Sequence, residues 1–246
     1  MARFFLPRRN IIGGIGVIDG AELEHLRKVL RLKSGDPITV FDDGGWEHEA
    51  MISSVASLRA EIEIVSSHQS DRESPLHLTL ALALTKGEKL DFVIEKATEL
   101  GVERIIPFAS AHAVPKLDER KVAARTERWQ KIALSAVKQC GRSKVPEIVP
   151  LMAFEDMLRS AEPRAANLLC WEKEAEQSLR HAHERLGDAK ALLIAIGPEG
   201  GFSLSEAESA RQHGFERVHL GRRVLRAETA AIAALSLAQF LWGDLG

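Results

Sequence analysis

The sequence lacks several features that would place it in familiar protein classes. It has only two cysteines, Cys140 and Cys170, which cannot build a disulfide framework, and it has no CxxC spacing of the kind that holds a metal. Its longest apolar runs, residues 76–84 and 191–196, are far shorter than the roughly 20 residues that cross a bilayer. The first residues lack the long apolar core of a signal peptide. We therefore expect a cytoplasmic protein with no metal site and no membrane span.

Charge and nucleotide-binding motifs are also limited. Lys and Arg number 33 against 35 Asp and Glu, and the net charge of −2 argues against a protein that coats nucleic acid through bulk charge. Local basic patches remain, at Arg3, Arg8 and Arg9 and along residues 116–144, where a solvated helix face is the simpler interpretation. The sequence has no Walker A motif. The glycines of residues 14–16 lack the third glycine and the βαβ unit of a dinucleotide fingerprint.

Residues 1–70 are predicted to form a small β-barrel. Residues 37–41 and 46–55 have the composition of strands, and the Asp-Gly between them is a strong hairpin signal. Residues 60–65 alternate apolar and polar side chains, as in a half-buried strand. The polar, aperiodic residues 66–75 end in proline and are predicted to be a linker.

One short helix is expected within this barrel. Asp19 is placed to cap its N-terminus, and Glu22, three residues later, would complete a capping box. The helical spacing of four apolar residues predicts one buried stripe, formed by Leu23, Leu26, Val29 and Leu30.

Residues 75–246 are predicted to form an α/β domain. Strand-like and helix-like segments alternate there, which favours a mainly parallel sheet. The last helical segment is apolar on nearly all sides, so we expect it to be buried in the domain or against a second subunit. Ser203 and Glu206 form a capping box for the helix before it. The expected strands are 76–84, 104–107, 167–171, 191–196 and 217–220, and the expected helices are 89–100, 118–139, 203–214 and 228–242.

Two glycine-bearing segments near the C-terminus, residues 194–203 and 220–230, are the strongest candidates for a ligand site. Each begins at the end of an apolar run and leads towards a helix. Loops at the carboxyl ends of neighbouring strands form nucleotide-like ligand sites in open α/β sheets. Glycines let the backbone approach a flat ligand, although a tight strand-to-helix turn is the structural alternative. The second segment also carries Arg226 and Glu228, which are candidate functional residues or, alternatively, a surface pair at a helix start.

In combination, these segments resemble a known signature. Gly197-Pro198-Glu199-Gly200-Gly201-Phe202-Ser203, followed by Leu220-Gly221-Arg222-Arg223-Val224-Leu225-Arg226-Ala227-Glu228-Thr229-Ala230, is similar to the signature of the bacterial 16S ribosomal RNA uridine-N3 methyltransferases of the SPOUT class. Similar segments also occur elsewhere, so that the resemblance covers nearly the whole chain; they are residues 3–5, 25–31, 86–89, 95–102, 139–142 and 145–146. Arg222, Ala227 and Lys138 depart from the usual pattern of the family.

The resemblance implies a fold and a function. The fold would be a PUA-like RNA-binding β-barrel followed by a SPOUT α/β domain with a trefoil knot. The function would be methylation of N3 of a uridine in 16S ribosomal RNA, with S-adenosyl-L-methionine as cofactor. The partners would be 16S rRNA or the small ribosomal subunit and a second copy of the chain in a homodimer.

The resemblance also implies roles for individual residues. Cofactor contacts are expected at Ile196, Gly197, Gly200, Gly201, Leu220, Gly221, Val224, Leu225 and Ala230. RNA contacts are expected at Arg3, Arg8, Arg9, Arg27, Arg31 and Arg142. Arg226 is expected to stabilise the negative charge that develops on the uracil carbonyl oxygens, and Glu228 to orient Arg226 or to act as a base. The alternatives are a non-catalytic RNA-binding ribosome assembly factor and a different α/β nucleotide-binding enzyme.

Overall fold

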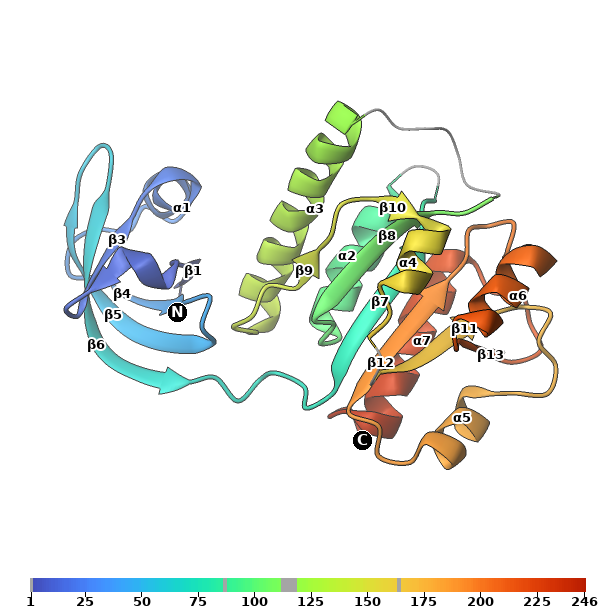
Figure 1. The fold of residues 1–246 in the computed structure, drawn as a ribbon. Helices are drawn as coiled ribbons and strands as arrows, with labels where there is room; N and C mark the ends of the chain where they lie inside the picture. The colour runs from blue at the N-terminus through green and yellow to red at the C-terminus, as the bar shows by residue number, and fades with distance from the viewer. Residues whose placement is uncertain (1, 86–87, 112–118, 163–164) are drawn as a thin grey trace. The chain divides into compact units, whose positions relative to one another are not determined.

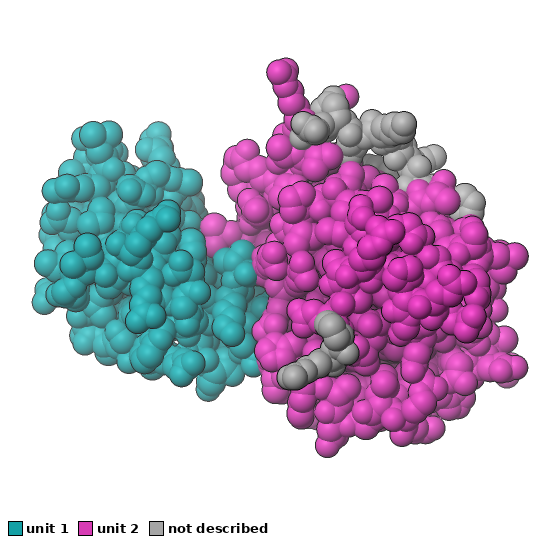
Figure 2. Space-filling view, in the orientation of Figure 1, with its two compact units in different colours: residues 1–73, 137–145 teal, residues 74–136, 146–246 magenta. Residues whose placement is uncertain are grey.

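A computed structural model describes residues 2–85, 88–111, 119–162 and 165–246. The chain forms two compact units (Figures 1 and 2). The first unit contains residues 1–73 and 137–145, and the second contains residues 74–136 and 146–246. The sequence predicted an uninterrupted C-terminal domain from residue 75. The structure differs because the end of helix α3 (Glu119–Cys140) and the turn after it pack with the N-terminal unit.

The first unit is a six-stranded sheet in the order β1-β4-β5-β6-β3-β2. β1 pairs with β4 in parallel, and the other neighbours are antiparallel. The predicted hairpin of β4 and β5 is confirmed, and both strands have the predicted bounds. The side chain of the buried Asp42 closes the turn by accepting hydrogen bonds from the backbone N–H groups of Gly44 and Trp46. The strands are β1 (Ala2–Phe5), β2 (Ile11–Ile12), β3 (Ile15–Ile18), β4 (Pro37–Phe41), β5 (Trp46–Val55) and β6 (Ala60–Gln69).

The buried apolar side chains of this unit form a core. It is formed by alternate residues of the strands, including Phe4, Ile38 and Ile62, which are fully buried. The core explains Gly16, the glycine of β3 that resembled part of a dinucleotide fingerprint. A Cβ at Gly16 would lie 2.8 Å from side-chain atoms of Ile62 and Leu6, so no larger residue fits there without repacking.

The predicted linker at residues 66–75 is wrong in its first part. β6 continues to Gln69, because β5 extends to meet it: Ser67 pairs with His48 in the ladder, and the Ser67 hydroxyl lies 2.8 Å from His48 Nδ1. The polar side chains of residues 66–69 are exposed on this strand. Their polarity reflects exposure to solvent rather than an absence of secondary structure.

The predicted short helix is partly wrong. Helix α1 (Gly20–Glu24) begins after Asp19 as expected, but the Asp19 side chain makes no capping hydrogen bond, and Glu22 pairs with Lys138. The chain then widens into one π-helical turn at His25–Val29. The extra residue in that turn breaks the 3.6-residue period. Leu23 and Leu26 are therefore buried, whereas Val29 and Leu30 of the predicted stripe are exposed.

The second unit is a seven-stranded parallel sheet, which confirms the predicted α/β class. Its order is β10-β8-β7-β12-β11-β13, with β9 also pairing with β8. Its central strands β7 and β12 are almost continuously apolar, as expected of strands that are covered on both faces. The strands are β7 (His77–Ala83), β8 (Arg104–Ala109), β9 (Glu147–Ile148), β10 (Met152–Ala153), β11 (Ala166–Cys170), β12 (Ala191–Ile196) and β13 (Glu216–Val218).

Helices cover both faces of this sheet (Figure 1). α4 and α6 share an apolar core with one face, and α2 packs with α7 on the other. The capping box of Ser203 and Glu206 at the start of α6 is formed in both directions, as predicted. Two groups of residues named in the sequence analysis lie outside the described residues. One is residues 86–87, which belong to a segment that carries the resemblance. The other is residues 116–118 of the basic run, which include the predicted helix start at 118. The further helices are α2 (Lys89–Glu99), α4 (Phe154–Arg159), α5 (Leu179–Leu186), α6 (Leu204–Gln212) and α7 (Ala227–Trp242).

Helix α7 is less completely buried than its sequence predicts. One side is covered, including Ala231, Leu235 and Ala238, but Leu237 and Phe240 are exposed on the other. Across the described parts of the chain, no helix combines the length and the apolar character needed to span a bilayer.

Candidate active site

The two glycine-bearing segments meet at one edge of the parallel sheet. The first follows β12 and the second follows β13, and both strands run parallel to β11, which lies between them. The prediction of directly neighbouring strands is therefore wrong in one respect. The intervening strand β11 ends at Cys170 and supplies three lining residues that the sequence did not assign to the site, Cys170, Trp171 and Glu172.

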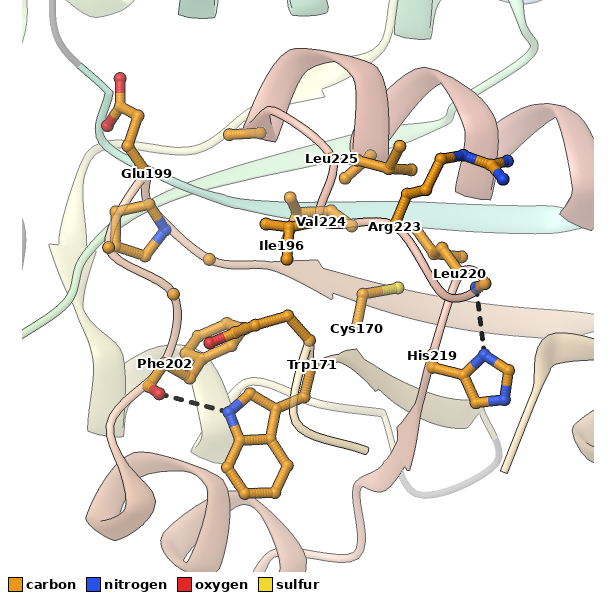
Figure 3. Close-up of a pocket in the computed structure, with 18 of the residues that line it drawn as sticks. Cys170, Trp171, Ile196, Glu199, Phe202, His219, Leu220, Arg223, Val224 and Leu225 are labelled. Atoms are coloured by element: carbon orange, nitrogen blue, oxygen red, sulfur yellow. Dashed lines mark hydrogen bonds between the residues drawn. The ribbon is translucent and has the colours of Figure 1, made fainter. Parts of the chain in front are cut away.

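Both segments line a single cavity of about 180 Å³ (Figure 3). All nine residues expected to contact a cofactor are among its lining residues. Ile196, Val224 and Leu225 lie together in its apolar middle, whereas the Glu199 side chain points away from them. Besides those nine and the three residues from β11 and its end, the lining includes Pro198, Glu199, Phe202, His219, Arg222, Arg223 and Ala227.

The first loop, residues 197–201, is held by the protein core. Its turn is closed by the Gly201 N–H, which donates to the Pro198 carbonyl at 2.9 Å. Gly201 has a φ of +69°, a conformation that favours glycine, and a Cβ there would make the exposed Glu172 carboxylate, 2.3 Å away, move aside. The loop ends on Phe202, which is 1% exposed and accepts a hydrogen bond at its carbonyl from Trp171 Nε1 at 3.2 Å.

The second loop, residues 220–226, has few such supports. The Gly221 N–H donates to His219 Nδ1 at 3.0 Å, and Gly221 has a φ of +106°. A Cβ at Gly221 would meet no atom within 4 Å. Val224 is 80% exposed, although it lines the cavity. This loop therefore presents backbone and apolar surface to whatever enters the site.

Cys170 belongs to the lining of the cavity and is half-buried. Burial raises the pKa of its thiol to about 12, which keeps the group protonated at neutral pH. Next to it, Trp171 packs under the Arg217 guanidinium, which lies 5.4 Å from the ring centroid.

Arg226 and Glu228 lie beside the cavity rather than in its lining. Arg226 is the exposed N-cap residue of α7, between Leu225 and Ala227, which both line the cavity. The Glu228 carboxylate lies 3.7 Å from the Lys89 ammonium, and the same ammonium donates to Glu199 at 2.9 Å. Among the described residues, no hydrogen bond or ion pair joins Arg226 to Glu228. Sequence reasoning missed the contribution of Lys89, because its partners lie more than 100 positions away.

Comparison with known proteins decides the family. The RNA methyltransferase domain family matches residues 72–239, and the RNA methyltransferase PUA domain family matches residues 18–65. The chain is 34% identical over 223 residues to ribosomal RNA small subunit methyltransferase E of Bacillus subtilis, which covers 89% of this chain and 87% of that protein. The chain belongs to the ribosomal RNA small subunit methyltransferase E family. These matches confirm the resemblance and the PUA-like character of the N-terminal sheet, and the trefoil knot stays a prediction.

Solved structures of methyltransferase E proteins and their relatives share this fold. A ribosomal RNA small subunit methyltransferase E from Neisseria gonorrhoeae, solved bound to S-adenosyl methionine, has a TM-score of 0.88 and 34% identity, with 100% of both chains covered. A putative methyltransferase from Legionella pneumophila, in complex with the bound cofactor SAM, has a TM-score of 0.85 and 33% identity, with 99% of both chains covered.

Two of the arginines predicted to bind RNA have structural roles in this member of the methyltransferase E family. Arg3 donates to the backbone carbonyls of Val137 and Arg142 and pairs with Glu47. Arg142 is 3% exposed and donates through Nε and Nη2 to Glu73 at 3.0 and 2.8 Å. Arg3 is half-buried and Arg142 is buried, and both guanidinium groups are already engaged in these contacts; for both, a role in binding RNA stays a prediction.

The pKa of the Glu73 carboxylate reflects its pairing with Arg142. Burial alone would raise its pKa, but the hydrogen bonds and charge of Arg142 and the backbone N–H groups of Ser143 and Lys144 outweigh burial and lower the pKa below its ordinary value. By contrast, the side chains of Arg8, Arg9, Arg27 and Arg31 are exposed. For these four, a role in binding RNA stays a prediction.

Proposed function

We propose that this chain transfers a methyl group from S-adenosylmethionine to N3 of a uridine in 16S ribosomal RNA, in the cytoplasm. The observation that carries the proposal is that one cavity is lined by all nine residues expected to hold the cofactor. Two solved relatives, each more than 30% identical to the chain, were solved with that cofactor bound, which supports the same ligand here. A non-catalytic assembly factor would have no need for such a cavity.

The residues present fit the cofactor. The apolar side chains of Ile196, Val224 and Leu225 suit the faces of an adenine ring. The glycines of both loops leave backbone N–H and carbonyl groups accessible for its polar edges. Bound S-adenosylmethionine would supply an electrophilic methyl group on a sulfonium sulfur.

The protein must then prepare the uracil. N3 carries a proton at neutral pH, so the N3–H bond has to release its proton to a base while N3 forms the new bond to carbon and the sulfur–carbon bond electrons return to sulfur. We assign Arg226 to the uracil carbonyl oxygens, where negative charge develops. We assign proton acceptance to Glu228, because no contact in the described residues lets it orient Arg226.

The RNA would contact the N-terminal unit through exposed arginines. Arg8 and Arg9 are adjacent in the chain; Arg27 lies in the π-helical turn, and Arg31 lies two residues after its end. Phosphate contacts of this kind make affinity fall as salt rises, with a log–log slope that scales with the number of phosphates neutralised. Replacing Arg8 and Arg9 together should weaken RNA binding and flatten that slope, and unchanged binding would remove this surface from the proposal.

The proposal includes a homodimer. Leu237 and Phe240 are three residues apart, so they share one face of α7, and Phe240 is 61% exposed. Phe92, on the neighbouring helix α2, is also exposed. A second copy covering α7 would remove this apolar surface from water. Sedimentation should give a dimer for the natural chain and a shift towards monomer for Phe240→Asp.

The decisive experiment is nucleoside mass spectrometry of 16S rRNA from a strain that lacks this gene. We expect N3-methyluridine to be lost and then restored by this chain, but not by its Arg226→Ala variant. Wild-type levels of N3-methyluridine in the deletion strain would overturn the proposal.

A further inference from the structure

Lys89 joins the two loops of the cavity through their carboxylates. It is the first residue of α2, and its ammonium donates to Glu199 Oε1 of the first loop at 2.9 Å. The same ammonium lies 3.7 Å from Glu228 Oε2, in the first turn of the helix that the second loop leads into. One cation therefore contacts both segments that line the cavity, from a third part of the chain.

This arrangement differs from the other lysine of α2 that lies between two carboxylates. The Lys96 ammonium contacts Glu95 at 2.6 Å and Glu99 at 2.8 Å, and both belong to α2 itself. The side chains of Lys89 and Lys96 are similarly exposed, at 32% and 31%. The two lysines therefore have comparable local charge, but only the ion pairs of Lys89 connect different loops.

The Lys89 ammonium lies between the two carboxylates. Glu228 Oε2 is buried and has no hydrogen-bond partner among the described residues, and Glu199 lines the cavity next to the glycines of the first loop. Without this ammonium, both carboxylates would lose an attraction that draws them towards the start of α2. Pairs that are partly open to solvent add little stability, so the effect of this one lies in where it holds the two segments.

We propose that Lys89 is a positioning residue that holds both loops at the spacing required for the methyl donor. This inference rests on the proposed function, because it specifies how that cavity keeps its shape. Lys89 acts through Glu199 and Glu228 and need not touch the cofactor. Its loss should therefore weaken cofactor affinity more than it slows the reaction at saturating cofactor.

The test compares Lys89→Met with the matched control Lys96→Met and the conservative variant Lys89→Arg. Calorimetry should give a dissociation constant for S-adenosylmethionine about tenfold higher in Lys89→Met, about 1.4 kcal/mol, and within about twofold of the natural value in Lys96→Met and Lys89→Arg. Steady-state kinetics should show the same rise in KM for the cofactor in Lys89→Met and in Glu199→Gln, with kcat lowered by less than about threefold in Glu199→Gln, which leaves the contact between Lys89 and Glu228 in place. A general loss of stability would not produce that split.

A double-mutant cycle gives a second readout that does not depend on Lys89→Met alone. Glu199→Gln should weaken cofactor binding in the natural chain and to the same extent in the Lys89→Arg background, where the bridge is kept, but by less than about twofold in the Lys89→Met background, where the bridge is already lost. If Lys89→Met does not fold, Glu199→Gln in the natural chain still measures the bridge from the other side. Natural affinity in Lys89→Met or in Glu199→Gln, or zero coupling between Lys89→Met and Glu199→Gln, would overturn the inference. Failure of the natural chain itself to bind the cofactor would instead overturn the proposed function.

Discussion

The two loops that line the cavity are built in opposite ways. The first is fixed by the core, because it ends on the buried Phe202, whose carbonyl accepts a hydrogen bond from Trp171. The second has an open glycine, Gly221, and an exposed apolar residue, Val224. Both contain a glycine with positive φ, but only the first is held at its end by a buried side chain.

This contrast indicates a division of labour within the cavity. A loop held by packing and hydrogen bonds is preorganised and can fix the position of a ligand before it binds. A loop with exposed apolar surface gains contacts when a ligand or a second subunit covers it. The first loop should therefore control cofactor affinity, and the end of the second loop, which carries Arg226, should control the reaction.

The largest effect is expected at the end of the second loop. Arg226→Ala should lower kcat by about 10²- to 10³-fold, because it removes the positive charge assigned to the developing uracil anion. The dissociation constant for S-adenosylmethionine should change less than about twofold, since Arg226 does not line the cavity. Arg211→Ala, which removes an exposed arginine of the same unit, is the control and should retain activity. Near-normal turnover of Arg226→Ala would remove its catalytic role.

The next effect is expected in the first loop, from Gly201→Ala. A Cβ would be forced into a left-handed conformation, at about 1–2 kcal/mol, in a loop that the buried Phe202 holds in place and that cannot relax freely. Calorimetry should show at least about a tenfold loss of cofactor affinity. Gly214→Ala, at the end of α6, places a Cβ at a positive φ in open space away from the cavity and is the control for strain alone. Equal cofactor affinity in both variants would contradict the packing account of the first loop.

A smaller effect is expected from Gly221→Ala in the second loop. The backbone strain is of the same order, but the added methyl group meets no atom within 4 Å. Cofactor affinity should fall by about threefold to fivefold in calorimetry. A loss larger than that of Gly201→Ala would reverse the comparison between the loops.

The smallest effect is expected from Trp171→Phe. The variant keeps an aromatic ring but removes the N–H that donates to the Phe202 carbonyl, which is worth about 1 kcal/mol. Thermal unfolding should show a modest loss of stability, and cofactor affinity should fall about threefold. An unchanged affinity together with lower stability would assign this bond to folding and not to the shape of the first loop.

The sequence predicted those parts of the molecule that depend on local signals. Three elements follow from short-range patterns and are found where expected. They are the capping box of Ser203 and Glu206, the β4–β5 hairpin and the nearly apolar strand β7. The nine cavity residues were expected from a family signature confined to two short segments.

The parts that the sequence did not predict depend on contacts between distant residues. Strand β11 lies between the two loops because of sheet order, which no local pattern encodes. Arg142 resembles a surface arginine until Glu73, 69 residues earlier, is found beside it. Val29 is exposed because a π-helical turn shifts the helical period, and the sequence carries no strong signal for such a turn.

The most direct measurement is a calorimetric titration of the natural chain with S-adenosylmethionine. The convergence of two glycine loops on one methyl donor predicts saturable binding with a micromolar dissociation constant and one site per chain, weakened by Gly201→Ala. No saturable binding, or binding that Gly201→Ala leaves unchanged, would contradict the claim that these loops form the cofactor site.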